Sequence, residues 1–249
     1  MSSSLTLNRR PIPILVYHQI SEAPPKGSPF RSLYVAPAAF SQQMGLLKML
    51  GYRGLSMGAL QPYLLGQCEG RVVGITFDDG YQNNLTHALP VLAKNGFSST
   101  CYAVSGQLGK SNIWDEKLGI AQTRLMDESE IRTWVASGQE IGSHTRNHID
   151  LTKADDQVCR SEMLGGSTDL KAVIQQPVVH FCYPYGSFED RHVDMLKTDG
   201  FVSATTTQRS RCAAGTDLLQ LPRVPVLRST GLPLFLLKIA TRYEDRRKK

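Results

Sequence analysis

The stretch VVGITFDDG, residues 72–80, combines a buried strand with an acidic turn. Residues 72–77 read as apolar on both faces, as in a parallel sheet, and the strand ends abruptly at Asp78-Asp79-Gly80. Neighbouring side chains in an extended segment point to opposite sides, so one carboxylate can bind a metal while the other faces water or substrate. The alternative is an ordinary Asp-Asp-Gly turn that caps the next helix.

Strand and helix patterns alternate on both sides of this stretch. Further strands are predicted at residues 12–17, 98–104, 138–143, 177–183, 201–205 and 224–227. Helices are predicted at residues 37–50, 85–95, 127–136, 152–175 (interrupted by Gly165-Gly166), 189–198 and 233–243. Repeated strand, helix, strand units indicate a parallel sheet or barrel.

Polar residues follow the carboxyl ends of the predicted strands, namely His18, Asp78, Asp79, His144 and Tyr185. Barrels of the α/β class place their chemistry at this end of the strands. We therefore expect an α/β fold in which a parallel barrel brings these segments together. An open doubly wound sheet also binds ligands there, but no Gly-x-Gly-x-x-Gly follows these strands, which weakens the nucleotide-binding version of that alternative.

Length and composition indicate one globular domain. The chain has 249 residues, 41% hydrophobic and 20% charged, and no repeat or long linker divides it. We expect a barrel domain over residues 12–241, an N-terminal tail at 1–11 and a basic tail at 242–249. Five cysteines, none in a Cys-x-x-Cys pair, disfavour a structural zinc cluster or a disulfide framework and indicate a reducing compartment.

The net charge of +6 lies mostly in the two tails. The body of the chain is close to neutral, which disfavours a nucleic-acid partner. The tails are expected either to be solvated or to contact an anionic membrane surface peripherally. No apolar run has the length of a signal peptide or a bilayer crossing, so we expect a cytoplasmic protein, with the membrane surface as a second location.

Two histidines four residues apart, His144 and His148, can place both imidazoles on one cation. With a carboxylate from another strand end they would form a two-histidine, one-carboxylate site that keeps open positions, as catalytic metal sites do. A cation there would lower the pKa of a bound water towards ~7, and the spare aspartate would take its proton. This chemistry indicates amide or ester hydrolysis. A non-haem iron oxygenase uses the same ligands but gives no reason for the second acid.

Three ordered segments resemble a known family. Thr76-Phe77-Asp78-Asp79-Gly80, His144-Thr145-Arg146-Asn147-His148 and Tyr183-Pro184-Tyr185-Gly186 resemble the first three motifs of the polysaccharide deacetylases, also called NodB-homology proteins or carbohydrate esterase family four. Tyr17-His18 resembles the start of the subgroup that contains the poly-N-acetylglucosamine deacetylases. The resemblance spans residues 12 to 226. It implies a distorted (β/α) barrel of about seven parallel strands.

The resemblance also implies metal-dependent removal of N-acetyl groups from the hexosamine units of a polysaccharide or a lipid-linked saccharide. By motif position, Asp78 would be the general base, and Asp79, His144 and His148 the metal ligands. Zinc is the default metal, and cobalt, nickel, iron or manganese would also suit this ligand set. Tyr185 would offer its backbone N–H to the oxyanion of the tetrahedral intermediate.

Further contacts with the substrate are expected from the segments around these motifs. Pro184 and Gly186 flank Tyr185 in the third motif, and Tyr81 and Trp114 could stack on sugar rings. The alternative for these aromatic residues is packing within the barrel.

The sequence departs from the family pattern at two places. Cys182 stands where many members carry an arginine that orients the base, so the base must be held otherwise. The late Leu-x-x-His motif is missing, since its region reads Leu219-Gln220-Leu221-Pro222-Arg223. We expect His18 to protonate the leaving amine, with a structural histidine as the alternative, and Arg223 to order the site electrostatically. Two functional alternatives stay open: a catalytically weakened glycan-binding protein, and a hydrolase of a non-sugar amide.

Overall fold

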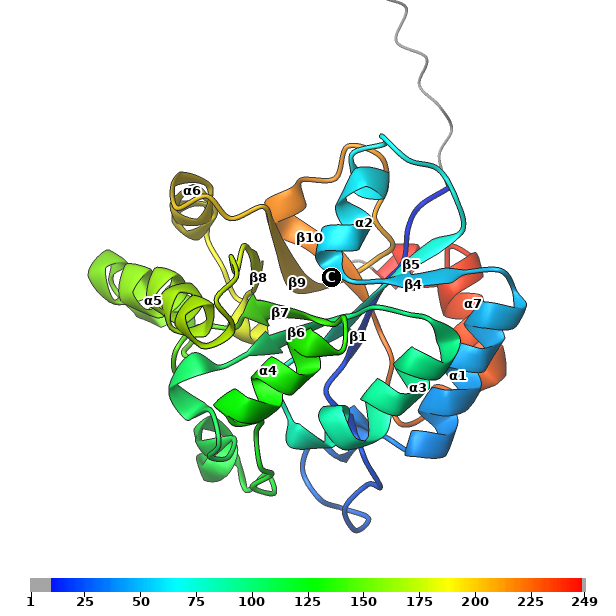
Figure 1. Ribbon diagram of the computed structural model, residues 1–249, viewed down its shortest axis with the longest axis horizontal. Helices are drawn as coiled ribbons and strands as arrows, with labels where there is room; N and C mark the ends of the chain where they lie inside the picture. Colours follow the sequence, from blue (N-terminus) through cyan, green and yellow to red (C-terminus); the bar gives the residue numbers. More distant parts are fainter. Residues whose placement is uncertain (1–9, 248–249) are drawn as a thin grey trace, which may run out of the picture.

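A closed barrel of parallel strands forms the centre of the computed structural model, which describes residues 10–247 (Figure 1). Its strands are β1 (Ile14–Tyr17), β5 (Val72–Phe77), β6 (Thr100–Ala103), β7 (Glu140–Ser143), β8 (His180–Cys182), β9 (Ser203–Arg209) and β10 (Leu221–Pro225). Strand β1 pairs with both β10 and β5, which closes the barrel, and β4 (Arg53–Leu55) adds to β5. The predicted single-domain (β/α) barrel is confirmed, and the open doubly wound sheet was wrong.

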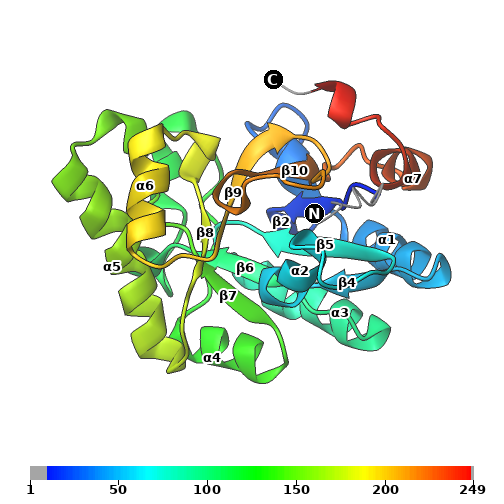
Figure 2. The same ribbon diagram turned by 90° about the horizontal axis from the view of Figure 1, so that it is seen from above.

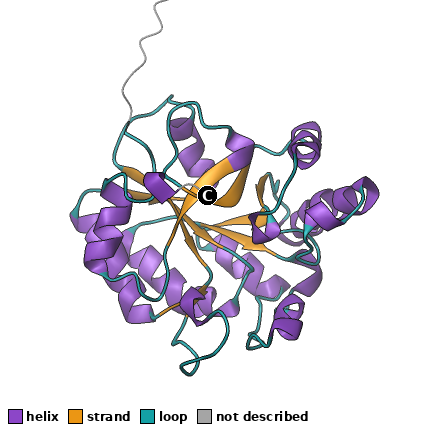
Figure 3. Ribbon diagram, turned by 180° about the vertical axis from the view of Figure 1, so that it is seen from behind, coloured by secondary structure: helices purple, strands orange, loops and turns teal. Residues whose placement is uncertain are grey.

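Helices surround the strands, as Figure 3 shows. They are α1 (Pro37–Met49), α2 (Met57–Leu64), α3 (Leu89–Asn95), α4 (Glu128–Ala136), α5 (Asp156–Ile174), α6 (Asp190–Thr198) and α7 (Leu232–Ala240). Local sequence explains several ends. Helix α4 starts in a capping box between Asp127 and Glu130, and α1 starts with Pro37 at its first position.

Two groups of helices pack on opposite flanks of the barrel, α1 with α3 and α5 with α6 (Figure 2). Of the four residues that the sequence predicts for the inner face of the first helix, Phe40, Met44 and Leu47 are fully buried, whereas Leu50 is partly exposed. The ring of Tyr17 at the end of β1 lies 5.2 Å from Phe40 and 5.7 Å from Phe77, centroid to centroid. Aromatic contacts of this kind fix the ends of β1 and β5, where the polar residues begin.

The structure differs from the predicted elements at α5, where Gly165-Gly166 was expected to interrupt the helix. The helix runs unbroken from Asp156 to Ile174. A Cβ on Gly166 would lie 2.9 Å from Ser143 Oγ, so the missing side chain lets the helix approach the loop that follows β7. The pair of glycines therefore reflects close packing under the histidine loop rather than a helix end.

Four short elements and one irregular turn were not predicted. Strand β4 and helix α2 are brief, and α2 contains Pro62, so neither has a long periodic pattern. Residues Asn84–Ala88 form a π-helical turn before α3, where one continuous helix was expected. A short parallel pair, β2 (Gln19–Ile20) with β3 (Tyr34–Val35), lies after β1.

The segment 242–247, expected to belong to a basic tail, is packed on the barrel. Glu244 is fully buried, and its carboxylate pairs with Arg209 at 2.7 Å and with Lys238 at 2.5 Å. Asp245 pairs with Arg211 at 2.7 Å. Acidic side chains of this segment thus meet basic side chains of β9, the loop after it and α7, which docks the chain end.

Of the other predicted tail residues, 10 and 11 are described, and 1–9 and 248–249 lie outside the described residues. Among residues 10–247, no helix has both the length and the apolar character needed to cross a bilayer.

Candidate active site

A pocket of about 410 Å³ lies at the carboxyl ends of the barrel strands. Predicted site residues that line it are His18 after β1, Asp78 and Asp79 after β5, His144 and His148 after β7, and Tyr185 after β8, together with Tyr81 and Trp114. Residues up to 167 positions apart in the sequence therefore share one cavity. The barrel brings them together because parallel strands end on the same side.

Several turns of this pocket hold non-glycine residues in the left-handed region. The φ angles are 73° at Asp79, 66° at Thr145, 55° at His148 and 60° at Tyr185. A non-glycine residue in this region costs on the order of 1–3 kcal/mol and persists only where the surrounding fold holds it. The clustering of these turns around one pocket is typical of a functional site.

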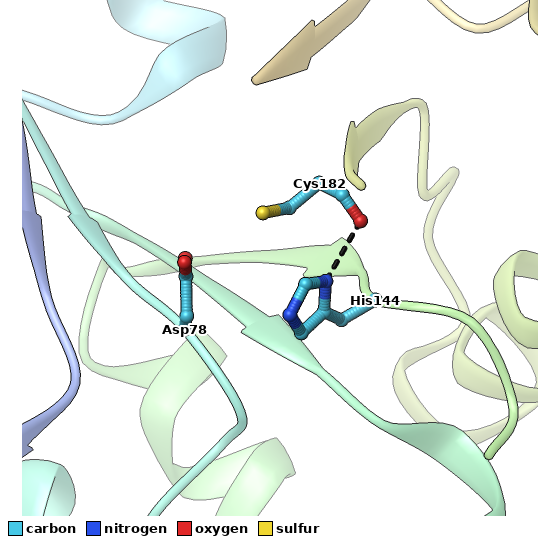
Figure 4. A group of neighbouring side chains, drawn as sticks. All are labelled: Asp78, His144 and Cys182. Carbon is cyan, nitrogen blue, oxygen red and sulfur yellow. Dashed lines mark hydrogen bonds between the residues drawn. The ribbon is translucent and has the colours of Figure 1, made fainter. Parts of the chain in front are cut away.

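Asp79, His144 and His148 form a compact group of potential metal ligands in the pocket. The Asp79 Oδ1 atom lies 3.5 Å from His144 Nε2 and 3.4 Å from His148 Nε2, and all three side chains are buried. The His144 Nδ1 atom lies 2.7 Å from the carbonyl oxygen of Cys182, which only accepts hydrogen bonds (Figure 4). Nδ1 therefore carries the proton, and the Nε2 lone pair is free for a ligand.

The donor geometry fits a divalent cation. Two ligands that are each about 2.1 Å from a zinc ion at the tetrahedral angle lie about 3.4 Å apart, close to the separations observed here. The backbone N–H of His148 donates to Thr145 Oγ1 at 2.9 Å, which braces the turn that carries this ligand. In the described part of the chain, the buried Nδ1 atom of His148 has no hydrogen-bond partner.

Charge states in the pocket agree with this assignment. Burial raises the pKa of Asp79, but the adjacent imidazoles of His144 and His148 lower it well below its usual range, so the carboxylate is ionised as a ligand must be. Burial also lowers the pKa of His148, which keeps that imidazole neutral. For His144, burial lowers the pKa, but Cys182, Asp79 and Asp78 raise it well above normal. The negative surroundings that favour a proton on this imidazole also favour a cation, which would displace the proton from Nε2 on binding.

A second group, Asp78, His144 and Cys182, also brings potential ligand atoms together. Figure 4 shows the Cys182 carbonyl facing the His144 ring while the sulfur lies on the other side of the residue. The sulfur accepts a contact from Arg223 Nη2 at 3.3 Å. Because Asp78 is itself engaged by Arg223, this group fits a cation less well than the first one.

The guanidinium of Arg223, in β10, holds Asp78. Its Nη1 and Nη2 atoms donate to the two carboxylate oxygens at 2.7 Å each, and its Nε donates to the Thr206 carbonyl at 2.9 Å. The arginine is 1% exposed. Burial alone would raise the pKa of Asp78, but the charge and hydrogen bonds of Arg223 lower it below its ordinary value.

The Arg223–Asp78 pair explains how the base is held although Cys182 replaces the usual arginine. The sequence shows that the usual arginine is missing before Pro184 and that the base needs another support. The structure supplies that support from β10 instead of β8. Arg223 is expected from the sequence to order the site, but the sequence does not identify Asp78 as its partner.

The Pro184-Tyr185-Gly186 turn projects Tyr185 into the pocket. The N–H groups of Gly186 and Ser187 donate the hydrogen bonds that close the turn, which leaves the Tyr185 amide outside them. Gly186 has φ of 71°, and a Cβ there would collide with Thr207 Oγ1 at 1.9 Å. Pro184 is buried. Pro184 and Gly186 thus shape the turn, while Tyr185 forms part of the pocket wall.

The other predicted site residues take different positions around the ligand group. His18 is half-buried and lies in the pocket with Asp78. Trp114 stacks on the His148 ring, with centroids 4.6 Å apart and planes 20° from parallel. Tyr81 is 3% exposed, and burial followed by the charge of Asp79 raises the pKa of its hydroxyl well above normal. Trp114 thus packs on the ring of one predicted ligand, and Tyr81 is buried next to another, Asp79.

A closed (β/α) barrel with an aspartate pair and two histidines at its strand ends defines a barrel hydrolase. The sequence model of the polysaccharide deacetylase family matches residues 66–204, more than half of the chain. The chain belongs to this family, and it is a polysaccharide N-deacetylase, an enzyme that hydrolyses carbon–nitrogen bonds. The resemblance seen in the three motifs is confirmed.

Relatives match over most of the chain. YxkH of Bacillus subtilis (strain 168) is 28% identical over 217 residues, which cover 86% of this chain and 71% of that protein. A poly-β-1,6-N-acetyl-D-glucosamine N-deacetylase of Staphylococcus epidermidis is 24% identical over 206 residues, 77% of this chain and 68% of that protein.

Solved structures show the same arrangement. The deacetylase PplD of Streptococcus pyogenes, solved with acetate, has a TM-score of 0.80 and 26% identity, covering 92% of this chain and 98% of that chain. IcaB of Ammonifex degensii has a TM-score of 0.73 and 25% identity, covering 90% of this chain and 94% of that chain. The whole barrel is therefore shared with these proteins.

Proposed function

We propose that this enzyme removes N-acetyl groups from N-acetylhexosamine units in a metal-dependent reaction, with Asp79, His144 and His148 as the metal ligands and zinc as the default metal. The observation that carries the proposal is the convergence of three buried ligand atoms at 3.4–3.5 Å, with the His144 tautomer fixed by the Cys182 carbonyl. A bound divalent cation would polarise the acetyl carbonyl and make water a better nucleophile.

The substrate class follows from the family and its relatives. The Staphylococcus epidermidis relative is named for poly-β-1,6-N-acetyl-D-glucosamine. An N-acetylglucosamine unit of a polysaccharide or of a lipid-linked saccharide is therefore the substrate that we propose for this chain.

The residues of the chain divide the chemical work. Asp78, ionised and fixed by Arg223, accepts the proton of the attacking water. The amide N–H of Tyr185 donates a hydrogen bond to the oxygen that becomes negative in the tetrahedral intermediate. Arg223 keeps both carboxylate oxygens of Asp78 in one place, which orients the base at no cost at the moment of reaction.

The leaving amine needs a proton, and we propose that His18 supplies it. His18 is a pocket residue, it directly follows β1, the strand paired with β5, and the chain has no histidine after His192. Arg223 is unsuited to this role because a guanidinium paired with a carboxylate holds its proton firmly. The base, Asp78, and the acid, His18, thus follow the ends of two adjacent strands, β5 and β1.

Acetate release tests the proposal. The protein is stripped with a chelator, reloaded with zinc or cobalt, and assayed on N-acetylglucosamine oligomers and on an N-acetylglucosamine glycolipid. We expect activity only after reloading, and a loss of about 10³-fold in Asp78→Asn, since a general base is worth roughly 10²–10⁴. Tight saccharide binding without acetate release would favour a binding protein. Turnover of simple N-acetyl amides but not of sugars would favour a non-sugar amide hydrolase.

A further inference from the structure

Apolar side chains form part of the lining of the catalytic pocket. Four of its side chains, Phe30, Leu33, Leu118 and Ile120, are called the apolar rim below. They come from two connections, residues 21–33 between β2 and β3 and residues 104–127 between β6 and α4. Phe30 is 51% exposed and Leu118 is 53% exposed, so these two rim side chains face water, whereas Ile120 is buried.

The first connection holds its part of the rim in place. Arg31 Nε donates to the Pro24 carbonyl at 2.6 Å, and the Arg228 N–H donates to the Ser32 carbonyl at 2.8 Å. Phe30 has φ of 51°, a conformation that a bulky side chain rarely adopts. The fold thus keeps an exposed phenyl ring at the pocket mouth despite a backbone cost, which a loose surface loop would avoid.

The second connection is equally ordered. The buried Asn112 side chain accepts from the Thr123 N–H at 2.7 Å and donates to Asp115 Oδ2 at 3.0 Å, which closes the loop on itself. The two connections also meet, since a Cβ on Gly119 would lie 4.0 Å from Pro29 Cγ. They lie side by side at the lower edge of Figure 1, in blue and green. The rim is therefore one preorganised wall.

The position of the rim limits what can occupy it. When the N-acetyl group lies at Asp78 and the two histidines, other parts of the substrate meet the remaining lining of the same pocket, which includes the rim. Sugar hydroxyls lose hydrogen bonds with water unless the protein replaces them, and the rim side chains offer no polar atom. An alkyl chain has no hydrogen bonds with water to lose. Its binding removes apolar surface of both the chain and the rim from water.

We propose that the pocket binds an N-acetylated sugar that carries an apolar aglycone, an alkyl or acyl chain as in a glycolipid, and that the apolar rim contacts this chain. This inference rests on the proposed function, because it takes the reacting N-acetyl group to the floor of the same pocket. The preordered side chains lose little conformational entropy when the chain binds, which favours affinity.

A series of glycosides tests the inference. The zinc-loaded enzyme is assayed for acetate release from the methyl, butyl and octyl β-glycosides of N-acetylglucosamine, below the concentrations at which they form micelles. We expect kcat/KM to rise along the series by up to about threefold for each methylene that is buried. In the double variant Phe30→Ser, Leu118→Ser, the octyl-to-methyl ratio falls to below about 3.

The matched control is Leu164→Ser, which removes a leucine that is 42% exposed on α5, away from the pocket. This variant should keep the wild-type octyl-to-methyl ratio. A wild-type ratio near 1, an unchanged ratio in the double variant, or a gain with oligosaccharide length but none with alkyl length would each overturn the inference.

Binding measurements separate this inference from the proposed function. Calorimetric titration of the Asp78→Asn protein with the octyl and methyl glycosides requires no turnover. If the octyl glycoside binds more tightly than the methyl glycoside, and the double variant loses this difference, the rim contacts the alkyl chain even if no substrate releases acetate. Equal binding of the two glycosides contradicts it even if the enzyme is active.

Discussion

Both ends of the barrel contain a buried histidine beside a carboxylate. At the carboxyl ends of the strands, His148 Nε2 lies 3.4 Å from Asp79 Oδ1. At the amino ends, His180 Nε2 lies 3.6 Å from Glu140 Oε1. These residue types and distances alone do not distinguish a catalytic site from a structural contact.

Hydrogen bonding distinguishes the two ends. Glu140 accepts from the Gly58 N–H at 3.1–3.2 Å and from Thr100 Oγ1 at 2.5 Å, and His180 Nδ1 lies 2.8 Å from Ser203 Oγ. At the amino ends, the hydrogen-bonding groups of Glu140 and His180 thus have partners within the protein. These bonds join four strands to α2.

At the carboxyl ends, Asp79 meets two imidazole nitrogens at 3.4 and 3.5 Å, and His148 Nδ1 lacks a partner among residues 10–247. These side chains also sit on turns with positive φ beside a pocket. Unsatisfied buried groups on strained turns indicate a ligand site, whereas the same groups fully bonded indicate a structural role.

The largest expected difference between the two ends is in activity. Asp78→Asn should lower kcat about 10³-fold with little effect on stability. Glu140→Gln should keep kcat within about threefold but lower the free energy of unfolding by about 1–3 kcal/mol, because an amide cannot accept all the donors around the carboxylate. Acetate release and urea unfolding measure the two effects. Similar activity losses in both variants would contradict the assignment of a catalytic role to the carboxyl ends and a structural role to the amino ends.

A smaller effect is expected from Arg223→Lys. Lysine keeps the charge but loses the two parallel hydrogen bonds to Asp78, so kcat should fall by about 10- to 100-fold while KM and zinc content stay the same. Arg211→Lys is the matched control, since Arg211 also donates two bonds to one carboxylate, at 2.7 and 3.2 Å, but far from the pocket. A similar loss of kcat in both variants would contradict the positioning role.

The smallest effect on stability is expected at Asp245, whose carboxylate, like that of Glu140, already has hydrogen-bond partners within the protein. Burial raises its pKa, but the hydrogen bonds and charge of Arg211 lower it below its ordinary value. The pair therefore stabilises the fold at pH values above about 4 and loses this contribution as the pH falls through the lowered pKa. Asp245→Asn should cost about 0.5–1 kcal/mol in urea unfolding at pH 7. The difference from wild type should shrink at pH 3, and a difference that grows there would contradict the pairing.

The sequence was sufficient to place Asp78, Asp79, His144 and His148 in one pocket. Each follows a predicted strand, and parallel strands in a barrel end on one side. The same logic brought His18 and Tyr185 to the pocket.

The sequence was not sufficient where a contact depends on strand order. Arg223 is 145 positions from Asp78, and the two meet because β10 and β5 both flank β1. Gly165 and Gly166 were interpreted as a helix break because their real cause, the approach of α5 to the histidine loop, is a tertiary contact. The docked segment 242–247 was interpreted as a tail because its acidic residues find partners in β9, the loop after it and α7.

Metal content tests the central claim most directly. Wild type, His148→Ala and His180→Ala are stripped, dialysed against zinc and analysed for bound metal by atomic emission. We expect about one zinc ion per chain in wild type and in His180→Ala, and none in His148→Ala. Zinc retained by His148→Ala, or lost equally from both variants, would contradict the assignment of the site to the carboxyl ends of the strands.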